Sequence, residues 1–160
     1  MIEVKVLTVY YDEANKSPVV LLKEIEGNRV LPIFIGYAEA AAISYALDKV
    51  QFVRPLTLDL MKRIIESLNY SVKKVVITKI LDNTFYAEVI LESDGKYVAV
   101  DARPSDSIGL ALRTNAPIYV AEEVMDVCGT VISESDEERL ERIRESIKRQ
   151  RPEDLGNFQI

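Results

Sequence analysis

The segment from residue 71 to residue 101 constrains the fold more than any other part of the chain. It reads as strands at 71–81, 84–92 and 96–101, joined by "LDNT" and "SDGK". The second connection carries the Asp-Gly pair that favours a tight hairpin, and connections this short join antiparallel strands. Within "FYAEVILE", residues 85–92, strict alternation predicts one apolar face, formed by Phe85, Ala87, Val89 and Leu91.

The remaining patterns add further strands and several helices, so the fold class we expect is α+β. The additional strands are predicted at 2–11, 17–25 and 29–36 and within "APIY". Pro32 has no N–H group to donate, which favours an edge or a bulge in the third strand. Helical spacing of apolar residues predicts helices at 37–50, across "RPLTLDLMKRIIESLNY", after Pro104, after "PIYVA" and at 133–150.

These elements predict a single compact domain whose mostly antiparallel or mixed sheet is packed with helices. We expect this domain to span 1–132 and a charged helix with a tail to span 133–160. A strand, a turn with an acidic residue and a small-residue helix occur at both 30–47 and 97–112, a weak sign of internal duplication.

Several sequence features bear on the cellular location of the protein. The N-terminus lacks the layout of a signal peptide and no apolar run reaches the ~18 residues of a membrane span, so we expect no membrane association. The lone Cys128 has no partner for an internal disulfide, which favours the cytoplasm.

The absence of histidine limits the available chemistry. It excludes imidazole bases, Ser-His and Cys-His dyads and imidazole metal sites, leaving carboxylates, Arg, Lys, Tyr or hydroxyl groups, with Mg²⁺ or Mn²⁺ as suitable cations. The net charge of −6 argues against nonspecific nucleic-acid binding. Residues 49–80 nevertheless carry seven basic and two acidic side chains, including Lys62 and Lys73, which could form a local basic patch.

The sequence "DARPSDS", residues 101–107, marks a strand-to-helix corner with two interpretations. In the structural one, Ser105 or Asp106 caps the helix and Arg103 pairs with Asp101 or Asp106. In the functional one, the two carboxylates converge on a divalent cation or a water molecule while Arg103 holds a phosphate. The residue types alone slightly favour the structural interpretation.

The sequence "RPLTLD", residues 54–59, repeats this arrangement of Arg, Pro, hydroxyl and acid before a helix. Thr57 is the expected N-cap with Asp59 in the first turn, and the alternative is an oxyanion site that includes Arg54. If the two corners met in space, they would form one cleft with two arginines and three carboxylates. Glu39, at the head of the apolar helix, is either a dipole partner or a further metal ligand.

Several blocks together resemble the bifunctional nuclease (BFN) domain family. They are "LPIFIG" with "AEAAAISYAL", "RPLTLDLM", "TFYAEVIL" and "VDARPSDSIGLALRTNAPIYVAEEV", in order between about residues 2 and 126, with "RPEDLGNF" similar to the usual ending. The resemblance implies a compact α+β fold, often dimeric, and for some members nuclease activity on RNA and DNA. The characteristic polar positions of the family match Arg54, Thr57, Asp59, Asp101, Arg103, Ser105, Asp106 and Arg113.

Our leading hypothesis from the sequence is a metal-dependent nuclease. Its catalytic candidates are Asp101, Asp106, Asp59 and Arg103. Its substrate-binding candidates are Arg54, Thr57, Ser105, Arg113, Lys62 and Lys73. Its Mg²⁺ or Mn²⁺ ligands would be Asp101, Asp106 and Glu39. The alternatives are a non-enzymatic, homodimeric binding or regulatory module with structural Arg–Asp pairs, and a small-anion or nucleotide sensor.

Overall fold

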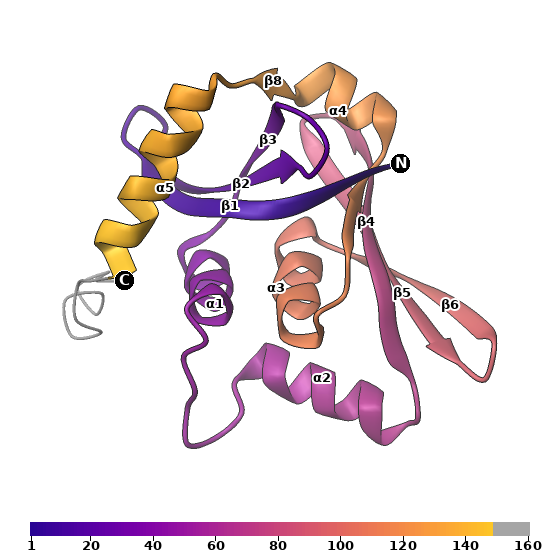
Figure 1. Ribbon diagram of the computed structural model, residues 1–160. Helices are drawn as coiled ribbons and strands as arrows, with labels where there is room; N and C mark the ends of the chain where they lie inside the picture. Colours follow the sequence, from indigo (N-terminus) through magenta and orange to yellow (C-terminus); the bar gives the residue numbers. More distant parts are fainter. Residues whose placement is uncertain (149–160) are drawn as a thin grey trace.

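A computed structural model describes residues 1–148, with side chains described through residue 142 (Figure 1). The predicted tail at 151–160 lies outside the described residues. The strands are β1 (Ile2–Asp12), β2 (Ser17–Glu24), β3 (Arg29–Phe34), β4 (Ser71–Leu81), β5 (Thr84–Ser93), β6 (Lys96–Ala102), β7 (Ile118–Val120) and β8 (Thr130–Val131). The helices are α1 (Tyr37–Leu47), α2 (Thr57–Ser67), α3 (Pro104–Thr114), α4 (Glu122–Cys128) and α5 (Glu134–Lys148).

One mixed sheet organises the described chain and confirms the predicted α+β class. Its strand order is β6-β5-β4-β7-β1-β2-β3-β8. The pairings are antiparallel apart from β4 with β7, so the prediction of a mostly antiparallel or mixed sheet is confirmed. Pro32 pairs with Leu21 of β2, whereas β8 reaches only Arg29 and Val30, so Pro32 has an unpaired edge as predicted.

Helices α1 and α3 lie side by side on one face of this sheet, with α2 crossing beneath them (Figure 1). Seven residues of α3 are buried, from Pro104 to Ala111, and Ile43 of α1 is fully buried in the same core. The strands contribute alternate residues to this core, including Ala87 and Val89 of β5, as the alternation in "FYAEVILE" predicts. We call this the helix-covered face and the opposite one the outer face.

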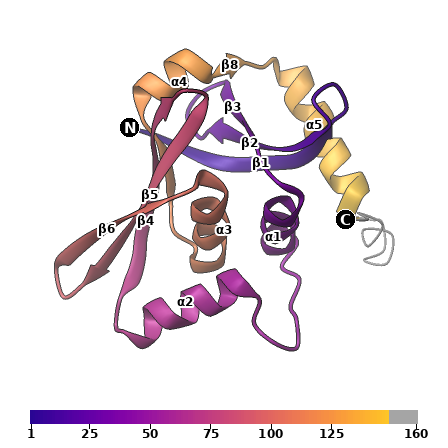
Figure 2. The same cartoon turned by 180° about the vertical axis from the view of Figure 1, so that it is seen from behind.

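The outer face is covered over β1–β3 by α5 (Figure 2). Leu140 of α5 packs against a small cluster formed by Leu7, Leu21 and Val30. The Lys23 ammonium group, in a buried residue, lies 3.4 Å from the Glu137 carboxylate of α5. The first half of α5 is therefore docked on the domain.

Among the described residues, no helix combines the length and the apolar character needed to cross a bilayer.

Replacing Ile43 by Ala tests how strongly α1 is anchored in the core. We expect the free energy of unfolding to fall by about 2–5 kcal/mol, because the truncation leaves a cavity in a fully buried site. Urea unfolding gives the measurement. Tyr45→Ala, on the same helix at a side chain that is 37% exposed, is the control and should cost much less. Equal losses would contradict this packing.

Candidate functional site

The strand-to-helix corner before α3 forms an ion-pair network with α1. Arg103 donates from Nε and Nη2 to the two carboxylate oxygens of Asp106, at 2.8 and 3.1 Å, and from Nη1 to Oε1 of Glu39 at 3.0 Å. We call these three residues the Arg103 corner. Asp106 and then Glu39 raise the pKa of Arg103 above its ordinary value. Gly36 leaves room for this arrangement, because a Cβ there would clash with the Glu39 carboxylate.

Neither helix that starts at this corner has a side-chain cap. The N-cap residue is Gly36 in α1 and Arg103 in α3. At neither position does a side chain accept a hydrogen bond from the backbone N–H groups of the helix. The interpretation that Ser105 or Asp106 caps α3 is therefore wrong, because Asp106 binds Arg103 instead. The first N–H groups of both helices are left for another acceptor, and both dipoles favour an anion there.

Ser105 adds an unused hydroxyl group at the same place. The residue is 7% exposed, and its hydroxyl makes no hydrogen bond within the described part of the protein. Every fully buried polar side-chain atom among the described residues has a partner, so the Ser105 oxygen must reach solvent. It does so in a shallow depression of about 420 Å³ that Glu39, Arg103 and Ser105 help to line. We call this hollow the α1–α3 depression.

Asp101 lies on the other side of the sheet from the Arg103 corner. It pairs with Glu88 of β5 across the strands, whereas the neighbouring Ala102 pairs with Ala87 in the core. Since successive residues of a strand point to opposite faces, Asp101 is on the outer face and exposed. The structure therefore does not bring Asp101 together with Asp106.

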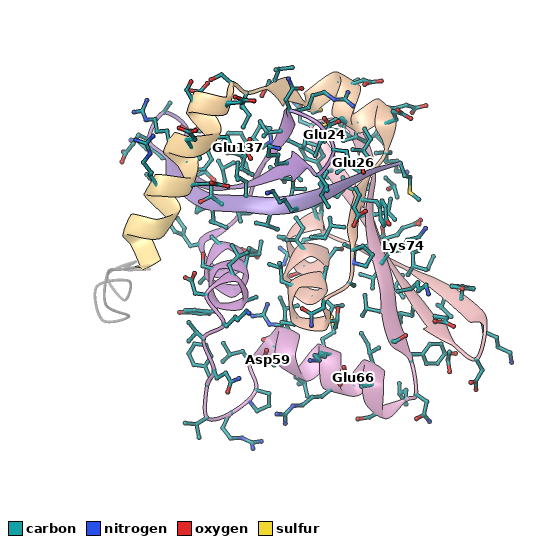
Figure 3. All side chains as sticks on the ribbon, viewed as in Figure 1. Glu24, Glu26, Asp59, Glu66, Lys74 and Glu137 are labelled. Carbon is teal, nitrogen blue, oxygen red and sulfur yellow. The ribbon has the colours of Figure 1, made fainter. Side chains whose placement is uncertain are left out.

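The second predicted corner lies at the far end of α3 and serves a different purpose. Arg113 donates to Asp59 of α2 at 3.0 Å, to the Ala42 carbonyl of α1 at 2.9 Å and to the Gly109 carbonyl of its own helix at 2.9 Å. Its side chain is only 9% exposed, so it acts as a brace between three helices. Figure 3 shows Asp59 at the start of α2, beneath α1 and α3.

The start of α2 differs from the sequence prediction. Thr57 is not the N-cap. That position is Leu56, whose N–H donates to the Asp59 carboxylate at 3.0 Å. The acidic side chain three residues after the N-cap thus accepts a hydrogen bond from the backbone N–H of the N-cap residue, and no hydroxyl group caps the helix. The sequence pattern did not distinguish these two arrangements.

The two corners do not form one cleft. They stand at opposite ends of the 11 residues of α3, about 15 Å apart at 1.5 Å per residue. Asp59, Thr57 and Arg113 therefore belong to one end, and Arg103, Ser105, Asp106 and Glu39 to the other.

The remaining predicted substrate-binding residues are not gathered at the Arg103 corner. Arg54 is exposed in the loop before α2, and Lys62 lies on α2 itself. Lys73 is near the start of β4, whereas the end of β4 leads into the turn that borders the α1–α3 depression.

The described side chains contain no group of three or more His, Cys, Asp or Glu residues placed to hold a metal ion. The three predicted metal ligands therefore do not lie together. Glu39 and Asp106 contact the same guanidinium group, and Asp101 faces away from them.

Sequence reasoning missed the residues that form the rest of the α1–α3 depression. The turn between β4 and β5 supplies Asn83, the start of β5 supplies Thr84 and Phe85, and Phe34 of β3 also lines the depression. The hairpin itself was predicted. No local signal indicates that its turn lies beside the starts of α1 and α3, because that placement depends on the curvature of the whole sheet.

Comparisons with known proteins identify the family of this chain. The sequence model that describes the bifunctional nuclease domain family matches residues 20–133 of this chain. The chain belongs to the bifunctional nuclease domain family. It is 44% identical over 144 residues to the uncharacterized protein MT1877 of Mycobacterium tuberculosis (strain CDC 1551 / Oshkosh), which covers 89% of this chain and 86% of that protein.

Plant relatives share a smaller part of their length. Bifunctional nuclease 1 of Arabidopsis thaliana is 31% identical over 107 residues, 64% of this chain and 33% of that protein. Bifunctional nuclease 2 of Oryza sativa subsp. japonica is 30% identical over 112 residues, 68% of this chain and 34% of that protein. The chain thus spans about a third of the length of these plant proteins.

The brace at Arg113 predicts an acid-sensitive contribution to stability. Partial burial tends to raise the pKa of Asp59, but the Leu56 N–H and Arg113 outweigh it and lower the pKa below 3.8. The stabilisation by Asp59 is therefore fully present above pH 3.8 and is lost as the pH falls through its folded pKa. We expect Asp59→Asn to lower the free energy of unfolding at about pH 7 and much less at about pH 3.

Urea unfolding of both proteins at the two pH values provides the test. Glu66→Gln, on the same helix (Figure 3), is the matched control and should have little effect at either pH. A deficit of Asp59→Asn that does not change with pH would contradict the ionic brace.

Proposed function

We propose that this protein is a nuclease that hydrolyses phosphodiester bonds of RNA or DNA at the Arg103 corner. Membership of the family supports this proposal, as do the plant relatives that carry the name bifunctional nuclease. One observation supports this location. Two helix starts without side-chain caps, an exposed arginine and the hydroxyl group of Ser105, which has no hydrogen-bond partner among the described residues, lie together at one depression.

This set of groups suits the oxygens of a phosphodiester. Arg103 has five N–H groups, and three of them bind Asp106 and Glu39. Two remain for a phosphate on a side chain that is 62% exposed. The Ser105 hydroxyl and the first N–H groups of α1 and α3 add neutral donors, so the site can bind an anion in a protein whose net charge is −6.

The general base in this proposal is a carboxylate, because the chain contains no histidine. Glu39 and Asp106 both accept hydrogen bonds from Arg103, so they lie beside a phosphate bound to the two remaining N–H groups of the guanidinium. One carboxylate then takes a proton from the attacking water, the water oxygen bonds to phosphorus, and the bond to the leaving oxygen breaks as that oxygen takes up a proton from the carboxylic acid just formed or from solvent water.

We include Mg²⁺ or Mn²⁺ in the proposal. Glu39 and Asp106 would supply the protein ligands, because Mg²⁺ commonly uses one or two carboxylates together with substrate phosphate. A bound cation would lower the pKa of water and neutralise charge on phosphate oxygens. Asp101, on the outer face, takes no part in this arrangement.

Cleavage of labelled single-stranded RNA and DNA with Mg²⁺, Mn²⁺ or EDTA tests the proposal. We expect cleavage to require the divalent cation. We expect Arg103→Ala, Glu39→Gln and Asp106→Asn each to lower the rate by about a hundredfold or more, because they remove the phosphate clamp or a proton acceptor. Glu66→Gln is the matched control and should cleave like the wild type.

Asp101→Asn separates the two hypotheses about the corner. The sequence pattern predicts that it abolishes cleavage, whereas the strand register predicts near wild-type cleavage. No cleavage by folded wild-type protein with any cation would contradict the nuclease proposal. Protection by phosphate without turnover would instead favour an anion sensor.

A second candidate function is a dimeric binding or regulatory module, and an exposed apolar surface favours the dimer. Helix α2 presents apolar side chains that are 38–65% exposed: Leu60, Met61, Ile64 and Leu68. Tyr97, Val98 and Val100 are exposed on β6, whose outer edge pairs with no strand among the described residues.

We propose that a second copy covers this surface, in an isologous homodimer that serves either function. Lys62 and Arg63 flank the apolar residues of α2, and Glu92 and Asp94 lie on the hairpin that carries β6. A two-fold arrangement that packs α2 of one copy against β6 of the other would bring these opposite charges together.

Ile64→Asp tests this dimer through the molar mass measured by light scattering after size exclusion. We expect wild-type protein to elute as a dimer and Ile64→Asp as a folded monomer, because a charge in an apolar interface must be desolvated. Val127→Asp changes a side chain that is 74% exposed on α4 and should remain dimeric. Monomeric wild-type protein would contradict the proposal.

A further inference from the structure

The α1–α3 depression extends beyond the Arg103 corner into a region of different character. Its lining there is apolar and partly aromatic and includes Phe34, which is 51% exposed, and Phe85, with the buried Ile33 and Ile35 behind them in the core. Polar residues line it as well, namely Asn83 in the turn between β4 and β5 and Thr84, the first residue of β5. A depression that only had to hold a phosphate would need no apolar lining.

Asn83 is suited to recognise a ligand. Its side-chain amide is exposed and makes no hydrogen bond within the described part of the chain. An amide offers both donors and an acceptor from one planar group, so it can bind the edge of a ring that carries both kinds of atom. Its backbone is in the left-handed region, with φ of 59°, which fixes it at the tip of the hairpin.

A nucleobase combines the features that this region complements. It has an apolar π face, which stacks on an aromatic or aliphatic surface, and a polar edge with donors and acceptors. In a nucleic acid the base lies one sugar away from the phosphate, and here the two kinds of surface adjoin in one hollow of about 420 Å³.

We propose that this region is a subsite for one unpaired nucleobase, with Phe34 and Phe85 against its face and Asn83 and Thr84 at its edge. The inference rests on the proposed function, since it assigns the neighbouring phosphate to Arg103. A base inside a duplex has both faces stacked and its Watson–Crick edge paired, so the substrate class is single-stranded nucleic acid. The subsite contributes sequence-tolerant affinity through stacking and a modest base preference through Asn83.

Binding without turnover separates this inference from the nuclease proposal. The probes are fluorescein-labelled single-stranded oligonucleotides in EDTA, one with normal bases and one of equal length with abasic sites, and fluorescence anisotropy gives Kd. We expect wild-type protein to bind the normal strand about fivefold or more tightly than the abasic one. A duplex of the same sequence should bind more weakly than the single strand.

The variant that tests the polar lining is Asn83→Gly, because glycine adopts positive φ without strain and removes only the side chain. Asn69→Gly is its matched control, since Asn69 also has a positive φ, of 62°, and ends α2 away from the depression. We expect Asn83→Gly to lose about threefold or more in affinity for the normal strand and little for the abasic strand. Asn69→Gly should match the wild type for both.

Three outcomes decide the inference. A preference of wild-type protein for normal over abasic strands that Asn83→Gly weakens and Asn69→Gly retains supports the subsite, even if no cleavage occurs in the nuclease assay. Equal affinity of wild-type protein for normal and abasic strands overturns the subsite, even if the protein cleaves both. A loss that is the same for both strands in Asn83→Gly also overturns it, because the turn would then support the phosphate site and not a base.

Discussion

Burial of α3 against the sheet is the constraint on which the arrangement of the polar residues depends. Its buried surface runs from Pro104 to Ala111 and leaves no freedom to rotate the helix without exposing Ile108 or Leu110. The positions of the arginines at the two corners are set by it, since Arg103 immediately precedes the helix and Arg113 lies in its last turn. The same packing that stabilises the core therefore fixes two charged sites about 15 Å apart.

The two arginines illustrate how similar sequence patterns acquire different roles. Arg113 is almost fully buried, and each of its three guanidinium nitrogens donates to protein oxygens on α1, α2 or α3. Arg103 is largely exposed and retains two N–H groups that no atom of the described residues accepts. Burial and partners, rather than residue type, distinguish a structural brace from a site that can bind a ligand.

Much of the fold was predictable because its signals are local. The strands at 71–101 follow from alternation and tight turns, and the antiparallel pairing of β4, β5 and β6 follows from those turns. The edge position of Pro32 follows from its missing N–H group. The sequence also identified Arg103, Ser105 and Asp106 as one group, since all three lie at one strand-to-helix corner.

The site was less predictable because it depends on contacts between distant segments. Glu39 and Arg103 are 64 residues apart and meet only because α1 and α3 pack together. The placement of Asp101 could have been found from sequence, since it precedes the inward-facing Ala102 on a strand, but proximity to Asp106 along the chain suggested a shared site. The turn at Asn83 joins the depression through sheet curvature, which no short pattern encodes.

The position of β7 has a consequence for how the chain acquires its structure during synthesis. This strand has three residues, yet it lies between β1 and β4 and joins them through an antiparallel and a parallel pairing. A nascent chain that ends before Ile118 holds two separate hairpin systems, β1–β3 and β4–β6, with no strand between them. The sheet becomes continuous only after Val120 has left the ribosome, so until then any contact between its halves must come from the helices, such as α1 with α3.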